Sequence, residues 1–247
     1  MNADFGGVSS ALAAVSGGVD SSVLLHLAKK AGIRVEAACV VSEFTAKSDI
    51  CAAEAAAKRE GVPFHILRIS LLDDSKIARN PENRCYLCKK RMAEALTACA
   101  EDLGLSAVFE GTNADDGIRP GLLALQEAGV KSPLLSVSKK EICDAAVSFV
   151  IPTPPPSACL ATRIPYGTPL TKELLLLVER AESMLRDAGV LGILRVRLKS
   201  MHEAVVETDN VSRYSAKFFE EKLTIIGIEN VSVEKYVCGG VEWIKKQ

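Results

Sequence analysis

Apolar runs alternate with amphipathic segments along the first 150 residues of the chain. Short apolar stretches of the kind that forms buried strands cover residues 9–15, 34–41, 64–69 and 106–110. Segments with helical spacing of their apolar positions follow at 21–30, 48–60, 85–103, 119–128 and 138–150. Strands that alternate with helices are typical of a parallel sheet covered on both faces. The pattern therefore predicts an α/β fold with a doubly wound parallel sheet.

A long loop interrupts the alternation. Residues 151–156 are dense in proline, and this composition together with the stretch at 157–169 excludes regular helix or strand. A loop of this length is either disordered or functional.

A shorter α/β pattern follows the loop. Thr171 is a suitable N-terminal cap for a helix that ends before Gly189. Short strands at 194–198, 204–208 and 230–237 alternate with one helix at 214–226. We therefore expect a domain boundary near Pro169, with a larger domain at 1–168 and a small α/β domain at 169–247.

Charge and composition narrow the class of protein. The 247 residues include 30 Lys and Arg against 31 Asp and Glu, and 48% are hydrophobic, as in ordinary globular proteins. A net charge of −1 argues against a protein whose main task is to bind a nucleic-acid backbone. No apolar run approaches the roughly 18 residues that a membrane span needs. No secretory signal is visible at the N-terminus, so we expect a cytoplasmic protein without a membrane partner.

Residues 16–22 form a glycine-rich loop between the first predicted strand and helix. Gly17 and Gly18 let the backbone approach an anion closely and adopt positive φ. The following helix presents free N–H groups and the positive end of its dipole, and hydroxyl donors come from Ser16, Ser21 and Ser22. We predict that the loop binds nucleotide phosphates. The alternative is a plain glycine-serine turn in which Asp20 caps the helix.

The string Ser-Gly-Gly-Val-Asp-Ser-Ser resembles the signature of the PP-loop ATP pyrophosphatases. That resemblance implies a doubly wound sheet, ATP with Mg²⁺, and cleavage between the α- and β-phosphates. It also implies that residues 16–18 and 20–22 hold the departing pyrophosphate. A second string, 111–116, begins with Gly111 after the fourth predicted strand and is similar to a motif shared by several of these enzymes. Open α/β sheets bind ligands at the carboxyl ends of their strands.

Three of the eight cysteines lie in settings that favour chemistry. A C-x-x-C pair arises by chance in roughly a quarter of chains with this composition. Cys85 and Cys88 are distinguished by their helical spacing, which puts both thiols on one face, and by a basic stretch at 76–91. Cys159 lies in the long loop beside Arg163. The alternatives are a solvated basic helix with two half-buried thiols and an inert thiol beneath the loop.

The other cysteines show no such context. Cys39 lies in a predicted strand, and Cys51, Cys99 and Cys143 lie in predicted helices among alanines, where cysteine behaves as a small apolar residue. Cys238 stays unassigned.

Six strings together resemble one family closely. They are SGGVDSS, NRCYLCK, GTNADD, RPG at 119–121, K-x-E-I at 139–142, and SACLATRIPYG at 157–167. The family is that of the pyridinium-3,5-biscarboxylic acid mononucleotide sulfur transferases (LarE) of nickel-pincer cofactor synthesis. The resemblance implies that a substrate carboxylate is adenylated, pyrophosphate leaves, and sulfur displaces AMP to give a thiocarboxylate. Some members consume the cysteine that matches Cys159, and others hold a [4Fe–4S] cluster on three cysteines. This chain has the three-cysteine pattern, at Cys85, Cys88 and Cys159.

The same resemblance implies roles for further residues. Catalytic or substrate-lining positions are Cys159, Lys89, Lys90, Thr162 and Arg163, and substrate-binding positions are Arg84, Arg195 and Arg197. Glu207 and Glu234 match acidic positions that hold a divalent metal, although both are equally consistent with solvated strand carboxylates. The implied partners are a small anionic nucleotide-like substrate, a sulfide source and further copies of the chain in a homo-oligomer. The chain departs from the family in a short segment after Asp116 and in Val205, where arginine is common.

Three other functions stay open. A tRNA thiolase of the same superfamily also combines a PP-loop with a three-cysteine cluster, but the net charge of −1 does not favour an RNA partner. An amide-forming adenylating synthetase with structural or zinc-bound cysteines is the second. A non-enzymatic nucleotide-sensing module with a structural zinc is the third.

Overall fold

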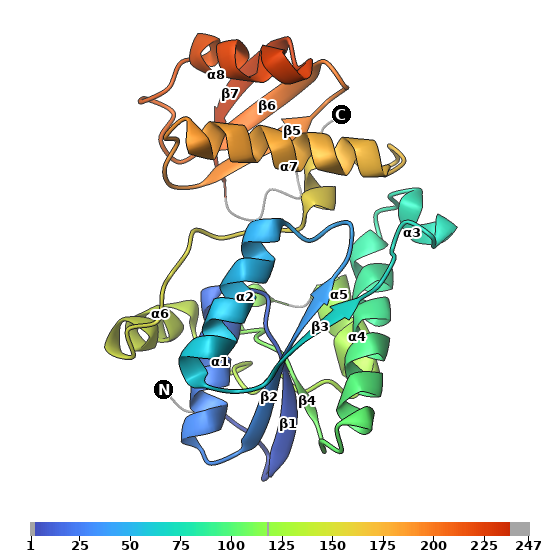
Figure 1. Cartoon of the computed structure of the whole chain (residues 1–247), viewed down its shortest axis with the longest axis vertical. Helices are drawn as coiled ribbons and strands as arrows, with labels where there is room; N and C mark the ends of the chain where they lie inside the picture. The colour runs from blue at the N-terminus through green and yellow to red at the C-terminus, as the bar shows by residue number, and fades with distance from the viewer. Residues whose placement is uncertain (1–2, 118, 238–247) are drawn as a thin grey trace. The chain divides into compact units, whose positions relative to one another are not determined.

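A computed structural model describes residues 3–117 and 119–237, and within them the chain divides into two units (Figure 1). The first unit comprises the chain up to Leu71 together with Asn83–Ser157. The second comprises Leu72–Glu82 together with the chain from Ala158 onward. The boundary near Pro169 stays a prediction. The sequence pattern gave no indication that residues 72–82 belong with the C-terminal part of the chain.

The first unit is built on a parallel sheet. In the described residues its strand order is β3-β2-β1-β4, with every pair parallel. The strands are β1 (Ser10–Ala14), β2 (Arg34–Val41), β3 (Phe64–Arg68) and β4 (Val108–Phe109). The prediction of β2 is confirmed to the residue. The strand predicted at 106–110 is shorter. Beyond its two ends, the side chain of Ser106 bonds to Ser10 and that of Glu110 to Thr112.

Helices cover both faces of this sheet, which confirms the doubly wound α/β fold (Figure 1). One face packs against α1 (Val19–Lys30), α2 (Lys47–Glu60) and α6 (Lys139–Ser148). The other packs against α4 (Arg84–Asp102) and α5 (Pro120–Glu127). Side chains alternate across β1 accordingly: Ala11 and Ala13 lie in the first core and Leu12 in the second. Fully buried alanines let the helices lie close to the strands.

The second unit carries a smaller sheet of order β5-β6-β7. β5 and β6 are antiparallel, whereas β6 and β7 are parallel. Helix α7 packs against β5 and helix α8 against β7, and Thr171 caps α7 as predicted, with its side chain accepting from Leu174 N. The elements are α3 (Ser75–Ala78), α7 (Lys172–Asp187), β5 (Leu194–Leu198), β6 (Glu203–Thr208), α8 (Ala216–Leu223), the 3-10 turn η3 (Thr224–Ile226) and β7 (Asn230–Lys235).

The proline-rich connection is a loop, as predicted, except for one turn. Residues Leu160–Arg163 form a 3-10 turn, η2, that begins directly after Cys159. The turn is closed by Thr162 N, which donates to Cys159 O at 3.0 Å. The predicted loop without regular helix or strand is therefore interrupted only by this short turn in the described residues.

Helix α6 ends in a strained residue, which gives a stability prediction. Val150 has a φ of +55°, in the left-handed region that β-branched residues rarely adopt. Ile151 N donates to Ala146 O at 2.8 Å and holds the chain in this helix-ending turn. Because the Val150 side chain is 84% exposed, glycine there loses no core contact. We expect Val150→Gly to raise the free energy of unfolding by about 1 kcal/mol in chemical denaturation.

Val147→Gly is the matched control. Val147 is 75% exposed and lies within α6, where its backbone is helical. Glycine should therefore lower the free energy of unfolding by roughly 0.5 kcal/mol. Destabilisation by Val150→Gly as well would show that the left-handed turn carries no strain.

Candidate active site

The glycine loop turns sharply between β1 and α1. Gly17 has a φ of +81°, and a Cβ there would lie 2.6 Å from Asp49 O and 2.8 Å from Ala52 Cβ. Any other residue would collide with the first turn of α2. Ser21 Oγ accepts from Ser16 N at 3.2 Å and donates to Gly18 O at 3.0 Å, so the loop is braced from within. It brings the backbone to the amino end of α1, where an anion is favoured.

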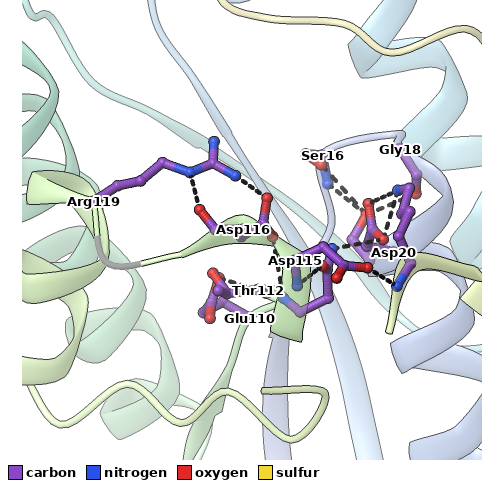
Figure 2. Close-up of polar contacts among 11 residues, drawn as sticks. Ser16, Gly18, Asp20, Glu110, Thr112, Asp115, Asp116 and Arg119 are labelled. Atoms are coloured by element: carbon purple, nitrogen blue, oxygen red, sulfur yellow. Dashed lines mark hydrogen bonds and ion pairs between the residues drawn. The ribbon is translucent and has the colours of Figure 1, made fainter. Parts of the chain in front are cut away.

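Asp20 does not cap α1, so the plain-turn interpretation was wrong on this point. Gly18 is the residue before the helix, and Asp20 lies in the first turn. Its carboxylate is held by two neighbours: Asn113 Nδ2 lies 3.2 Å away, and Lys139 Nζ lies 2.7 and 2.6 Å from the two oxygens. Figure 2 shows Asp20 between the glycine loop and the 111–116 string.

The 111–116 string meets the glycine loop at the carboxyl ends of β1 and β4. A Cβ on Gly111 would lie 3.0 Å from Ser21 N, so this glycine packs directly on the amino end of α1. Asn113 begins a 3-10 turn, η1 (Ala114–Asp116), in which the side chains of Asn113 and Asp116 cap each other's backbone. The structure therefore brings the two predicted motifs together, as the edge of an open sheet requires.

Side chains further from the loop fix this arrangement. Glu110 accepts from Thr112 N at 3.0 Å and from Thr112 Oγ1 at 2.7 Å, and it also bonds to Ser132. Arg119 Nε donates to Asp116 O at 2.6 Å, and its guanidinium pairs with the Asp116 carboxylate (Figure 2). These contacts hold the polypeptide on both sides of Asn113.

Lys139 is a site residue that the assignment of roles from the sequence missed. It is the first residue of α6, and its backbone N donates to Asp115 Oδ2 at 2.6 Å. Ser138 and Glu141 form a capping box that fixes the helix start, and the hydrogen bonds from Ser138 lower the pKa of Glu141. The signal in the sequence was this Ser-x-x-Glu pattern, which places Lys139 at a helix start.

Cys85 and Cys88 lie near the amino end of α4, which confirms the prediction that both belong to one helix. Both thiols are half-buried and free of disulfides. Helix α5 fixes this turn, since a Cβ on Gly121 would lie 3.0 Å from Lys89 Cγ. Tyr86 Oη donates to Glu127 Oε2 at 2.5 Å, and this hydrogen bond raises the pKa of Tyr86. Of the nearby predicted residues, Arg84 is buried, whereas Lys89 and Lys90 are exposed.

Cys159 lies in the second unit, at the start of η2. Its carbonyl oxygen accepts from Thr162 Oγ1 at 2.7 Å. Arg163, 3% exposed, donates to Ala158 O at 2.9 Å and pairs with Glu182 at 2.8 Å. Arg163 therefore holds the loop around Cys159 by a buried ion pair, which is a structural role in addition to the one predicted.

The predicted arginines and glutamates of the second unit share one face of its sheet. Arg195 and Glu207 are directly opposed across β5 and β6, and Glu207 is opposed to Glu234 across β6 and β7. Arg197 Nε lies 2.7 Å from Glu207 Oε1, and both side chains are buried. The second oxygen, Glu207 Oε2, is buried without a hydrogen-bond partner in the described residues. Val205 stands opposite Arg197.

Arg195 is a buried residue of β5 that contacts Tyr236. Its guanidinium lies 4.6 Å from the ring centroid of Tyr236 and donates to Tyr236 Oη at 3.2 Å. Arg195 Nε is buried without a hydrogen-bond partner among the described residues. Burial first, and then repulsion from Arg163, lower the pKa of Arg195. A buried arginine in this state favours an anionic ligand.

The remaining cysteines differ from one another. Cys39 is buried, and desolvation, followed by the charge of Asp49, raises its pKa to about 11, as expected for an inert core thiol. Cys99 and Cys143 are half-buried, but Cys51 is exposed, so its interpretation as a core thiol was wrong. The alanines around Cys51 face the core from other positions of α2. Cys238 lies outside the described residues.

No set of three or more His, Cys, Asp or Glu side chains is arranged around a metal position in the part of the chain that the structure describes. Cys85 and Cys88 belong to the first unit and Cys159 to the second. Helices long and apolar enough to cross a membrane are also missing from the described residues.

Comparison with known proteins agrees with this geometry. The family model of queuosine biosynthesis protein QueC matches residues 10–83. The fold, the glycine loop and this match define a PP-loop ATP pyrophosphatase, an enzyme class that uses ATP.

Three similar proteins indicate which family within this enzyme class the chain belongs to. Uncharacterized protein slr1717 of Synechocystis sp. is 36% identical over 79% of this chain and 75% of its own length. Pyridinium-3,5-bisthiocarboxylic acid mononucleotide synthase of Lactiplantibacillus plantarum is 30% identical over 71% of this chain and 67% of its own length. A tRNA-5-methyluridine(54) 2-sulfurtransferase of Pyrococcus horikoshii is 34% identical over 42% of this chain and 35% of its own length. The chain belongs to the LarE-like family of the synthase.

Proposed function

We propose that the protein is an ATP-dependent sulfur insertase that acts on pyridinium-3,5-biscarboxylic acid mononucleotide. A carboxylate oxygen of the substrate attacks the α-phosphorus of ATP, and the bond to the β-phosphate oxygen breaks, so pyrophosphate leaves. Sulfide then attacks the activated carbonyl carbon, and AMP leaves with the former carboxylate oxygen. The product is a thiocarboxylate. Family membership and the named sulfur-transferring relatives support this class of reaction.

The observation that carries the proposal is the junction of the glycine loop with the 111–116 string. A Cβ on Gly17 would collide with α2, and a Cβ on Gly111 would lie only 3.0 Å from Ser21 N. The two glycines therefore let the loop and the string meet at the amino end of α1, where helix N–H groups favour phosphate. Ser16, Ser21 and Ser22 are positioned by the same loop. Lys139 supplies a cation and Asp20 a carboxylate, which suits a magnesium–ATP complex.

The cysteines fit an iron–sulfur cluster by the chemistry of their donors. Cys85, Cys88 and Cys159 form no disulfide, and each is half-buried rather than sealed in a core. All three lie within six residues of the points at which the chain passes between its two units, at 82–83 and 157–158. A [4Fe–4S] cluster with three protein thiolates leaves one iron open, which supplies a place for the sulfide that is transferred.

Substrate and metal roles in the second unit follow from its charge. Arg195, with its unpartnered buried Nε, and Arg197 suit the phosphate or carboxylates of an anionic nucleotide. Arg84, Lys89 and Lys90 belong to the predicted basic stretch, and Thr162 completes the proposed lining. Glu207, whose Oε2 is buried without a partner in the described residues, and Glu234, its neighbour on β7, are the carboxylates that we propose for a divalent metal. The homo-oligomer and the sulfide source stay predictions.

A tRNA thiolase is the second candidate function. It is favoured by the partial identity to a tRNA sulfurtransferase, which covers 42% of this chain. The balanced charge of the chain, 30 basic against 31 acidic residues, opposes it.

The proposed function is tested by pyrophosphate exchange into ATP under anaerobic conditions. We expect exchange that requires Mg²⁺ and pyridinium-3,5-biscarboxylic acid mononucleotide and that persists without sulfide, because adenylation precedes sulfur transfer. Exchange that requires tRNA instead would favour the thiolase. AMP release that depends on ammonia and not on sulfide would favour an amide-forming synthetase, and ATP binding without exchange would favour a sensing module.

A further inference from the structure

Asn80 is a fully buried polar residue in an unusual backbone conformation. Its exposed fraction is 0%, and its φ of +56° lies in the left-handed region. The next residue is Pro81, which already restricts the backbone before it. Asn80 belongs to the second unit, although it lies only five residues before Cys85 in the sequence.

Hydrogen bonds join the segment around Asn80 to the chain that follows Cys159. Asn80 Nδ2 donates to Pro165 O at 2.7 Å and to Ile164 O at 3.4 Å. Asn80 O accepts from Gly167 N at 2.9 Å. Two residues earlier, Ala78 O accepts from Leu170 N at 2.7 Å. The two segments are therefore fastened at consecutive points, within one unit of the molecule.

The chemistry of this position selects asparagine. Only glycine, asparagine and aspartate adopt the left-handed conformation readily. Glycine has no side chain to donate, and an aspartate carboxylate would place negative charge against two carbonyl oxygens. Asparagine alone combines the backbone conformation with an N–H donor for Pro165 O and Ile164 O.

The loop that carries Cys159 is thus held from both sides. On one side, Arg163 pairs with Glu182 and donates to Ala158 O. On the other side, Asn80 holds Ile164 and Pro165, the two residues that directly follow η2. Five residues of chain span at most about 18 Å, so Cys85 stays within that reach of Asn80 in any arrangement of the two units.

We propose that Asn80 is a positioning residue that restrains the Cys159 loop and ties it to the segment leading into Cys85 and Cys88. By limiting how far these segments separate, it slows the loss of a cluster that the three cysteines hold. The effect on cluster loss rests on the proposed function, whereas the restraint of the Cys159 loop by Asn80 does not.

The first experiment uses the protein without metal. Alkylation by iodoacetamide is followed for each cysteine by mass spectrometry of its peptide. We expect Cys159 to react about tenfold faster in Asn80→Gly, because glycine keeps the backbone conformation and removes a buried donor. Cys143 in α6 should react at an unchanged rate. Asn80→Asp keeps the shape of the side chain and removes the N–H donor at neutral pH. It should therefore also raise the alkylation rate of Cys159.

Ser215→Ala is the control for a general loss of stability. Ser215 caps α8 through Phe218 N and lies in the same unit, but it makes none of the contacts described for the Cys159 loop. Removing this helix cap should lower the stability of the unit without changing the alkylation rate of Cys159. Equal alkylation rates of Cys159 in Asn80→Gly, Asn80→Asp and Ser215→Ala would overturn the proposal.

The second experiment measures iron release to a chelator after anaerobic reconstitution. We expect release about tenfold faster from Asn80→Gly than from the native chain or Ser215→Ala, at equal initial iron content. Faster alkylation with unchanged iron release would overturn the tie between the loop and the cluster. A native chain that takes up no iron would instead contradict the proposed cluster, while the alkylation rates would still decide the role of Asn80 in the loop.

Discussion

Lys139→Ala is expected to lower the rate of pyrophosphate release by about 10²- to 10³-fold, as loss of a positioned electrostatic contact does in other enzymes. Lys139 Nζ lies within 2.7 Å of both carboxylate oxygens of Asp20, in the first turn of α1. If the glycine loop holds the departing pyrophosphate as proposed, this ammonium beside the amino end of α1 stabilises the negative charge that develops there. The measurement is the rate of pyrophosphate formation at saturating ATP and substrate.

Lys140→Ala is the matched control for this prediction. Lys140 is the next residue of α6, is 84% exposed, and pairs only with Asp144 among the contacts described for it. Removing its charge should leave the rate within about twofold of the native value, since exposed ion pairs contribute little. Equal losses in the two variants, or a native rate in Lys139→Ala, would exclude Lys139 from the nucleotide site.

Cys159→Ala is expected to reduce bound iron from about four atoms per chain to less than one after anaerobic reconstitution, because a cubane held by two protein thiolates is poorly retained. Cys85→Ala should have the same effect, because it also leaves only two of the three proposed thiolate ligands. Iron and acid-labile sulfide are measured together with the absorption spectrum.

Cys143→Ala controls for the loss of any half-buried thiol. Cys143 lies in α6 and is half-buried like Cys159, and its removal should leave the iron content unchanged. Unchanged iron in Cys159→Ala would exclude the three-cysteine cluster. A native chain that loses the mass of one hydrogen sulfide during turnover would identify Cys159 as consumed in the reaction.

Local patterns in the sequence predicted the elements that hold the site. β2 runs over Arg34–Val41 as predicted, because an unbroken run of small and branched apolar residues suits a buried parallel strand. The glycine loop and the 111–116 string meet as expected, since both follow strands whose carboxyl ends share one edge of the sheet.

Contacts between distant segments were not predictable in the same way. The Asp20–Lys139 pair joins residues that are 119 positions apart. The Ser-x-x-Glu pattern places Lys139 at a helix start but does not indicate that its side chain reaches the glycine loop. The family resemblance assigned Arg163 to the substrate, and no local pattern indicated that its guanidinium also pairs with Glu182. Asn80 gave no signal at all, because its importance comes from carbonyl groups 84 and 85 residues away.

The most direct measurement of the central claim is the fate of isotopically labelled sulfide. The native protein is incubated anaerobically with ATP, Mg²⁺, pyridinium-3,5-biscarboxylic acid mononucleotide and sulfide enriched in ³⁴S. We expect a product whose mass shows one oxygen replaced by labelled sulfur, with AMP and pyrophosphate formed in equal amounts. AMP and pyrophosphate formed without any labelled product, or labelled sulfur found in tRNA and not in the mononucleotide, would contradict the proposed function.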